Sequence, residues 1–181
     1  MLKKFVEWQK KEYTQGQKML LALSLSTIFI FVFIPALPLL FFENIGNTLN
    51  LPEILISPLN IYLGLPIATT GLALFFWTVT LFLKIGQGTQ MPFIPTQKLV
   101  TTGPFAYCRN PMYLGVILWV TGLGIILNSP SFILSGLIVP FLYLIYMKAV
   151  EEKELEARFG REYLEYKKKV PFLIPSIFKK K

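Results

Sequence analysis

The chain has 181 residues, of which 54% are hydrophobic and 15% charged, whereas an average soluble domain is about 25% charged. It contains one cysteine, no histidine and no aspartate, which excludes a disulfide scaffold, a histidine-ligated zinc or haem site and a Ser-His-Asp hydrolase. The net charge of +8 does not indicate a nucleic-acid partner, because the apolar sequence must first be buried or placed in lipid. The length fits one domain, residues 1–181.

Three uncharged runs predict membrane-spanning helices. They cover residues 19–42, 54–83 and 110–147, and a spanning helix needs about 20 apolar residues. The first two runs predict spans at 19–42 and about 59–83. The third would be roughly 57 Å long as one helix, against a hydrocarbon core of about 30 Å. Because Asn128-Ser129-Pro130 is a turn signal, we expect a hairpin of 112–127 and 131–147, and so a polytopic all-α membrane protein with four spans.

The positive charges predict the orientation of these spans. All 18 Lys and Arg residues precede the first span, lie between the second and third, or follow the fourth. The positive-inside rule then places both termini in the cytoplasm, for an integral protein of the inner, plasma or an equivalent membrane. Residues 1–18, with Phe5 and Trp8 among lysines, are typical of an interfacial lead-in.

Small residues predict where the spans pack. They are Gly64, Ala68 and Gly71 on the second span and Gly115 and Gly122 on the third. Small side chains let membrane helices approach closely, so we expect these positions at helix contacts.

The connection between the second and third spans, residues 84–112, is long enough to need its own explanation. It contains apolar residues such as Ile94 and Phe105, and it predicts a folded cap with turns at Pro92, Pro95 and Gly103-Pro104. Gly86-Gln87-Gly88 lacks a third glycine and a preceding strand, so a dinucleotide-binding fingerprint is not supported.

Two charged features near the membrane boundary each allow two interpretations. Arg109 is either a snorkelling anchor or a fork that clamps a carboxylate or phosphate. Glu151-Glu152 is either solvated or turns one carboxylate inward, toward Arg109 or a bound cation. A stripe with three- and four-residue spacing follows and predicts one cytosolic amphipathic helix that Pro171 ends: Leu155, Phe159, Tyr163, Tyr166 and Val170.

Several motifs in a fixed order carry a resemblance to a known family. Residues 99–115 read LVTTGPFAYCRNPMYLG, the hairpin and Glu151-Glu152 follow, and residues 159–166 read FGREYLEY before Ile174-Pro175. This order resembles the isoprenylcysteine carboxyl methyltransferase family and its phospholipid methyltransferase relatives over about residues 84–175. The resemblance implies a membrane methyltransferase that uses S-adenosylmethionine and acts on a prenylated or other lipophilic acceptor among the membrane lipids.

The resemblance also implies site residues. The cofactor-binding positions are Lys98, Leu99, Val100, Gly103, Tyr107, Asn110, Pro111, Tyr113 and Glu152. Arg109 and Glu151 would lie nearest the reacting groups, and no metal is expected. Many members carry histidine where this chain has Asn110, which can donate or accept a hydrogen bond but cannot take up a proton at neutral pH.

Methyl transfer from a sulfonium suits a chain without His or Asp, because it requires alignment rather than a metal or a nucleophilic side chain. We therefore expect Cys108 to be a packing residue. A carboxylate acceptor needs no base, whereas an amine would need Glu151, Glu152 or Tyr113. The first interpretation is O-methylation of a carboxylate. Its alternatives are a phospholipid amine N-methyltransferase, an NADPH-dependent enzyme of the sterol-reductase type, and a membrane scaffold without activity.

Overall fold

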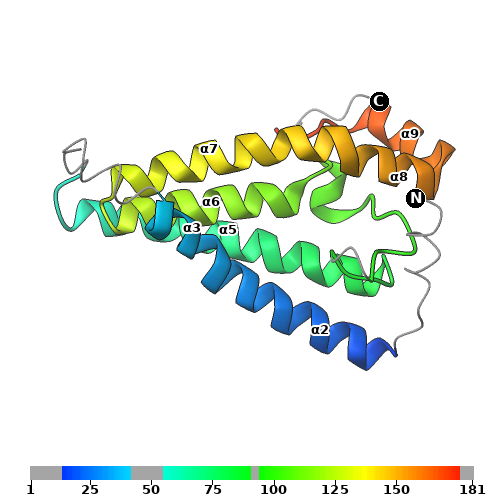
Figure 1. The fold of residues 1–181 in the computed structure, drawn as a ribbon, viewed down its shortest axis with the longest axis horizontal. Helices are drawn as coiled ribbons and strands as arrows, with labels where there is room; N and C mark the ends of the chain where they lie inside the picture. The colour runs from blue at the N-terminus through cyan, green and yellow to red at the C-terminus, as the bar shows by residue number, and fades with distance from the viewer. Residues whose placement is uncertain (1–13, 42–54, 91–93, 176–181) are drawn as a thin grey trace.

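The computed structural model describes residues 14–41, 55–90 and 94–175, and these form an all-helical fold (Figure 1). The predicted fold class is therefore confirmed over these ranges. The elements in chain order are α2 (Gln15–Ile28), η1 (Phe29–Phe33), α3 (Ile34–Phe41), α5 (Leu59–Lys84), η2 (Gly103–Ala106), α6 (Pro111–Ile126), α7 (Pro130–Tyr146), η3 (Met147–Glu151), α8 (Glu152–Phe159) and α9 (Arg161–Lys169). Residues 1–13 of the interfacial lead-in expected over 1–18, and the turn expected at Pro92, lie outside the described residues.

The first apolar run forms one helix with a π-helical turn in its middle. Thr14 and Gln17 form a reciprocal capping box that starts it, with N···O distances of 3.0 and 3.3 Å. The π turn, η1, precedes two prolines that cannot donate to the helical ladder. The carbonyl oxygen of Ile30 in this turn accepts a hydrogen bond from the indole Nε1 of Trp119, at 3.0 Å, which ties the first helix to α6.

Helices α5 and α6 pack through the small residues singled out in the sequence. A Cβ atom added at Gly71 would lie 2.4 Å from the backbone nitrogen of Trp119, and one at Gly122 would lie 2.4 Å from that of Ala68. Real Cβ atoms do not approach backbone so closely. The two helices are therefore in backbone contact, and their separation depends on the absence of side chains at these positions.

The turn at Asn128-Ser129-Pro130 is present, and it separates α6 from a longer helix than expected. Asn128 has a φ of 53°, and the Ser129 hydroxyl accepts a hydrogen bond from the backbone nitrogen of Phe132, at 3.3 Å. α7, η3 and α8 then run without interruption over Pro130–Phe159, 30 residues. Over the described ranges, three helices are long and apolar enough to cross a membrane: Met19–Leu40, Leu59–Lys84 and Pro130–Phe159. α6 is the fourth apolar helix and is shorter, at 16 residues.

The C-terminal stripe does not form the single helix expected. It begins within α8, which continues α7, and the helix breaks at Gly160, where φ is 55° and ψ is −127°. A residue with a side chain rarely adopts this backbone conformation, so the glycine allows the chain to change direction. α9 then runs to Lys169 and ends before Pro171.

The polar segments gather at one end of the molecule. The start of α2, the connection after α5, the start of α6, and α8 and α9 all lie at the right-hand end in Figure 1. Hydrogen bonds join the connection after α5 to the C-terminal segments, such as the one from the Arg109 backbone nitrogen to the Pro171 carbonyl oxygen, at 2.9 Å. The candidate site is built where they meet.

Candidate functional site

The connection after α5 is folded, as its apolar residues predicted. Ile94, Val100 and Phe105 are at most 5% exposed. The backbone nitrogen of Gln97 donates to the Gly86 carbonyl oxygen, at 2.7 Å, which closes the segment back onto the end of α5. The segment therefore delivers Arg109 and Asn110 to the start of α6 in a fixed arrangement.

A pocket lies between this connection, the adjoining ends of α6 and α7, and helices α8 and α9. Six of the eleven site residues that the family resemblance implied line it: Leu99, Val100, Arg109, Asn110, Tyr113 and Glu151. Tyr113 stacks on Tyr143 with ring centroids 4.8 Å apart, and Tyr143 lies 5.4 Å from Tyr146. The pocket wall thus combines aromatic faces with charged groups, a pattern typical of ligand sites.

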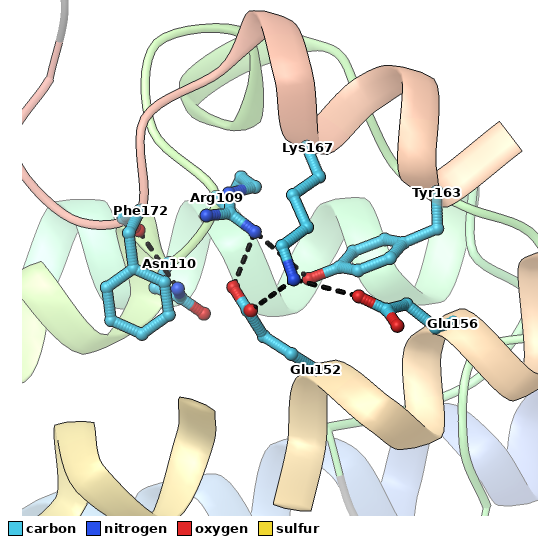
Figure 2. A network of polar contacts seen from close by, with 7 residues as sticks. All are labelled: Arg109, Asn110, Glu152, Glu156, Tyr163, Lys167 and Phe172. Atoms are coloured by element: carbon cyan, nitrogen blue, oxygen red, sulfur yellow. Dashed lines mark hydrogen bonds and ion pairs between the residues drawn. The ribbon is translucent and has the colours of Figure 1, made fainter. Parts of the chain in front are cut away.

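Arg109 is held by an ion pair with α8. Its Nη1 lies 2.5 Å from Oε1 of Glu152, and the two side chains are only 10% and 12% exposed (Figure 2). The same nitrogen donates to the hydroxyl oxygen of Tyr163 on α9, at 3.3 Å. Burial on both sides makes this pair stronger than a surface pair. For Glu151-Glu152, the sequence allowed either two solvated glutamates or one turned inward toward Arg109. The structure shows the second arrangement, and the inward glutamate is Glu152.

Glu152 uses both of its carboxylate oxygens within the protein. Oε1 is paired with Arg109, and Oε2 lies 2.6 Å from Nζ of Lys167 (Figure 2). Glu151 differs, because it lines the pocket and forms no ion pair within 4 Å with the described residues. Two adjacent glutamates therefore have different surroundings.

Asn110 joins the motif to the end of the described chain. Its Nδ2 donates to the carbonyl oxygen of Phe172, at 2.9 Å (Figure 2). The Phe172 ring lies under two cations, 5.4 Å from the guanidinium carbon of Arg109 and 5.2 Å from Nζ of Lys148. Asn110 thus holds the C-terminal segment at the pocket.

Burial changes the pKa of three groups at or next to the pocket: Tyr163 and Tyr166, which line it, and Cys108 beside them. It raises the pKa of the Cys108 thiol to about 11, against a weaker opposing effect of the Asn110 backbone. Burial also raises the pKa of Tyr163 and of Tyr166, whose hydroxyl donates to the Phe105 carbonyl oxygen at 2.6 Å. All three groups are therefore neutral at physiological pH.

The five remaining residues expected at the site do not line the pocket: Lys98, Gly103, Tyr107, Pro111 and Glu152, whose ion pairs are described above. Lys98 is exposed and Tyr107 is 47% exposed. Gly103, with a φ of 61°, begins the short helix η2, and Pro111 is the buried first residue of α6. These two shape the backbone around the pocket, while the predicted contacts of all five residues with a cofactor stay predictions.

Several pocket residues were not assigned a site role from the sequence. They include Gln90, Tyr143, Tyr146, Glu154, Arg158 and Tyr163. Glu154 and Arg158 form an ion pair one helical turn apart. Four pocket residues recur at helical spacing on the helix Pro130–Phe159: Glu151, Glu154, Leu155 and Arg158. This spacing can be recognised only when the helix is known to continue past Met147. Gln90 carries no such periodic signal.

The fold and site together define a polytopic, all-helical membrane protein whose polar pocket is assembled at one end of the helices. A family model for phospholipid methyltransferases matches residues 59–162, which is more than half of the chain. The chain therefore belongs to the phospholipid methyltransferase family.

Proteins named protein-S-isoprenylcysteine O-methyltransferase are similar over a shorter stretch. The protein of Mus musculus is 36% identical over 85 residues, 45% of this chain and 29% of its own length. That of Homo sapiens is 38% identical over 82 residues, 45% of this chain and 29% of its own. That of Saccharomyces cerevisiae is 38% identical over 79 residues, 44% of this chain and 33% of its own length. The alignments thus span about a third or less of these relatives.

A solved structure has a similar fold. It is a eukaryotic intramembrane Ras methyltransferase, isoprenylcysteine carboxyl methyltransferase, with a TM-score of 0.52 and 24% identity. The match covers 91% of this chain and 55% of that one. The covered share is larger than the family-matched residues 59–162, so the likeness in fold extends beyond them.

Proposed function

We propose that this chain is a membrane methyltransferase that uses S-adenosylmethionine to methylate a carboxylate on a lipophilic acceptor. The observation that carries the proposal is the position of Arg109. It lines the pocket, its Nη1 is engaged by Glu152, and its Nε is buried without a hydrogen-bond partner among the described residues. A buried donor without a partner is costly, and a bound carboxylate would satisfy it.

The pocket residues fit the proposed cofactor by their chemistry. Oε1 of Gln90 is a second buried atom without a partner among the described residues, and it can accept a hydrogen bond from a ligand. Tyr113, Tyr143 and Tyr146 present rings on which an aromatic base or a cation can rest. The carboxyl group of Glu151 also lines the pocket, and a bound sulfonium or ammonium would favour its ionised form.

The residues of this chain supply alignment and charge. S-adenosylmethionine, when bound, offers a methyl group already activated on a sulfonium, which an acceptor oxygen takes while the carbon–sulfur bond breaks to give a neutral thioether. Arg109 would orient the acceptor carboxylate with its free donors while Glu152 fixes the guanidinium. Low exposure of this pair strengthens its interactions with a charged ligand. No proton has to be removed from a carboxylate.

Methylation of an amine is the second candidate, and the match to the phospholipid methyltransferase family favours it. An ammonium acceptor must lose a proton before it attacks. Of the two adjacent glutamates, Glu152 is engaged by two cations, which leaves Glu151 as the carboxylate that faces the pocket. An amine acceptor would therefore depend on Glu151 more than a carboxylate acceptor would.

The charge distribution supports a cytoplasmic position for the pocket. The described cations from Lys84 onward lie at the end of α5, in the connection after it or beyond the apolar part of α7, at the pocket end of the molecule. The positive-inside rule places that end in the cytoplasm, together with both termini. A lipophilic acceptor would reach the pocket from the adjoining leaflet.

Labelled methyl transfer tests the proposal. Purified protein in nanodiscs is incubated with labelled S-adenosylmethionine and either a prenylated cysteine carboxylate, a phospholipid amine or a host lipid extract. We expect a labelled ester, lost in Arg109→Ala and kept in Arg161→Ala, whose side chain is 92% exposed. Calorimetry with the two cofactors supplies the contrary outcome, because binding of NADPH without binding of S-adenosylmethionine would contradict the proposal.

A further inference from the structure

Lys167 connects three elements around the pocket. From α9, its Nζ lies 2.6 Å from Oε2 of Glu152 and 2.8 Å from Oε1 of Glu156, both on α8 (Figure 2). Glu152 in turn holds Arg109, which belongs to the connection before α6. Lys167, Glu152 and Arg109 thus form a continuous chain of alternating charge from α9 to the pocket wall.

The carboxylate of Glu152 is restrained at both oxygens by this chain. With Arg109 on one oxygen and Lys167 on the other, the group cannot rotate without losing an ion pair. The side chain of Glu152 is 12% exposed, so water has little access to replace a lost partner. The orientation of Arg109 therefore depends on a group that Arg109 does not touch.

Lys167 itself is not a pocket residue. It is absent from the pocket wall, and its side chain is 34% exposed, against 10% for Arg109. Hydrogen bonds to Glu152 and Glu156 raise the pKa of the Lys167 ammonium above its usual 10.5, so it is charged at all physiological pH values. Of its two ion pairs, the one with Glu152 leads directly to Arg109.

We propose that Lys167 is a positioning residue that fixes Glu152 and, through it, the guanidinium of Arg109. The inference rests on the proposed methyl transfer, in which Arg109 orients the acceptor. Removal of the ammonium leaves Oε2 of Glu152 without its cation and frees the carboxylate to turn. A displacement of about 1 Å in an aligned group can reduce turnover about 100-fold.

The test compares Lys167→Met with Lys167→Arg and with Lys168→Met, a matched control on the exposed side of the same helix. For Lys167→Met we expect kcat per folded molecule to fall about 10- to 100-fold, with the KM for S-adenosylmethionine changed less than about threefold. Lys167→Arg should restore most of the rate, because it returns a cation to the two carboxylates. Lys168→Met should behave as the wild type.

A second readout does not depend on activity. Phenylglyoxal labels arginine, and the rate at Arg109 can be normalised to that at Arg161, which is 92% exposed. We expect this ratio to rise about threefold or more in Lys167→Met, as the ion pair that shields Arg109 loosens. If Lys167→Met does not fold, Lys167→Gln replaces it in both measurements.

The outcomes separate the two proposals. A wild-type protein that transfers no methyl group to any acceptor defeats the proposed function, and the labelling ratio still decides the role of Lys167. Wild-type kcat in Lys167→Met, an unchanged labelling ratio, or a loss of rate that disappears after correction for the folded fraction would each overturn the positioning role.

Discussion

The side-chain amide of Asn110 donates a hydrogen bond to the carbonyl oxygen of Phe172, at 2.9 Å, across 62 residues of sequence. The backbone nitrogen of Arg109, one residue earlier, donates to the Pro171 carbonyl oxygen at the same distance. Two consecutive residues of the motif thus hold two consecutive carbonyls of the C-terminal segment. This places the Phe172 ring under the guanidinium of Arg109 and completes the polar end of the molecule.

This relationship predicts how position 110 tolerates substitution. Asn110→Ala removes the donor and should lower the free energy of unfolding by about 1 kcal/mol, because a part-buried carbonyl loses its partner. Asn110→His should retain most of the stability, since a neutral imidazole also has one N–H donor. Thermal unfolding in detergent measures both. Equal stability of the Ala variant and the wild type would show that the bond has no net effect.

Cys108 should be unreactive in the folded protein. It is 1% exposed, and burial raises the pKa of its thiol to about 11, so at pH 8 roughly one molecule in a thousand carries the reactive thiolate. The pKa is raised, so reactivity should increase only as the pH approaches 11. N-ethylmaleimide should label the protein only after denaturation, as followed by intact mass at the one cysteine. Rapid labelling at neutral pH would contradict this burial, and Cys108→Ala should retain methyl transfer.

The contact between α5 and α6 should not tolerate the replacement of its glycines by alanine. Gly71→Ala would place a Cβ atom 2.4 Å from the backbone nitrogen of Trp119, so one helix must move. We expect a loss of about 1–3 kcal/mol in the free energy of unfolding. Gly16→Ala is the matched control, because nothing lies within 4 Å of its Cβ position on α2, and it should not be destabilising. Similar melting temperatures for both variants would rule out the close helix contact.

Gly160 should be required for the position of α9. Its φ of 55° with a ψ of −127° is costly for any residue with a side chain, although no atom lies within 4 Å of its Cβ position. Gly160→Ala should therefore cost about 1–3 kcal/mol through backbone strain alone. We also expect lower methyl transfer, because Lys167 moves with α9. A variant with both wild-type stability and wild-type activity would show that the break is not needed.

The sequence by itself determined the class of this protein. A spanning helix satisfies its backbone hydrogen bonds within its own residues, because a bilayer offers no other partners. Uncharged runs of helix length therefore indicate spans without reference to the rest of the chain. The turn at Asn128-Ser129-Pro130, the small residues of α5 and α6 and the motif through Arg109 were readable for the same reason. These features depend on residues close together in the chain.

Only the tertiary structure decided which groups meet. Glu151 and Glu152 are neighbours with the same side chain, so sequence cannot tell which one pairs with Arg109; the direction of each side chain from Pro130–Phe159 decides it. The break at Gly160 and the return of α9 to α8 bring Lys167 to Glu152. In a single straight helix, the separation of 15 residues between them would keep the two side chains far apart. Ion pairs depend on distances of a few ångströms, and those distances arise only when separate segments pack.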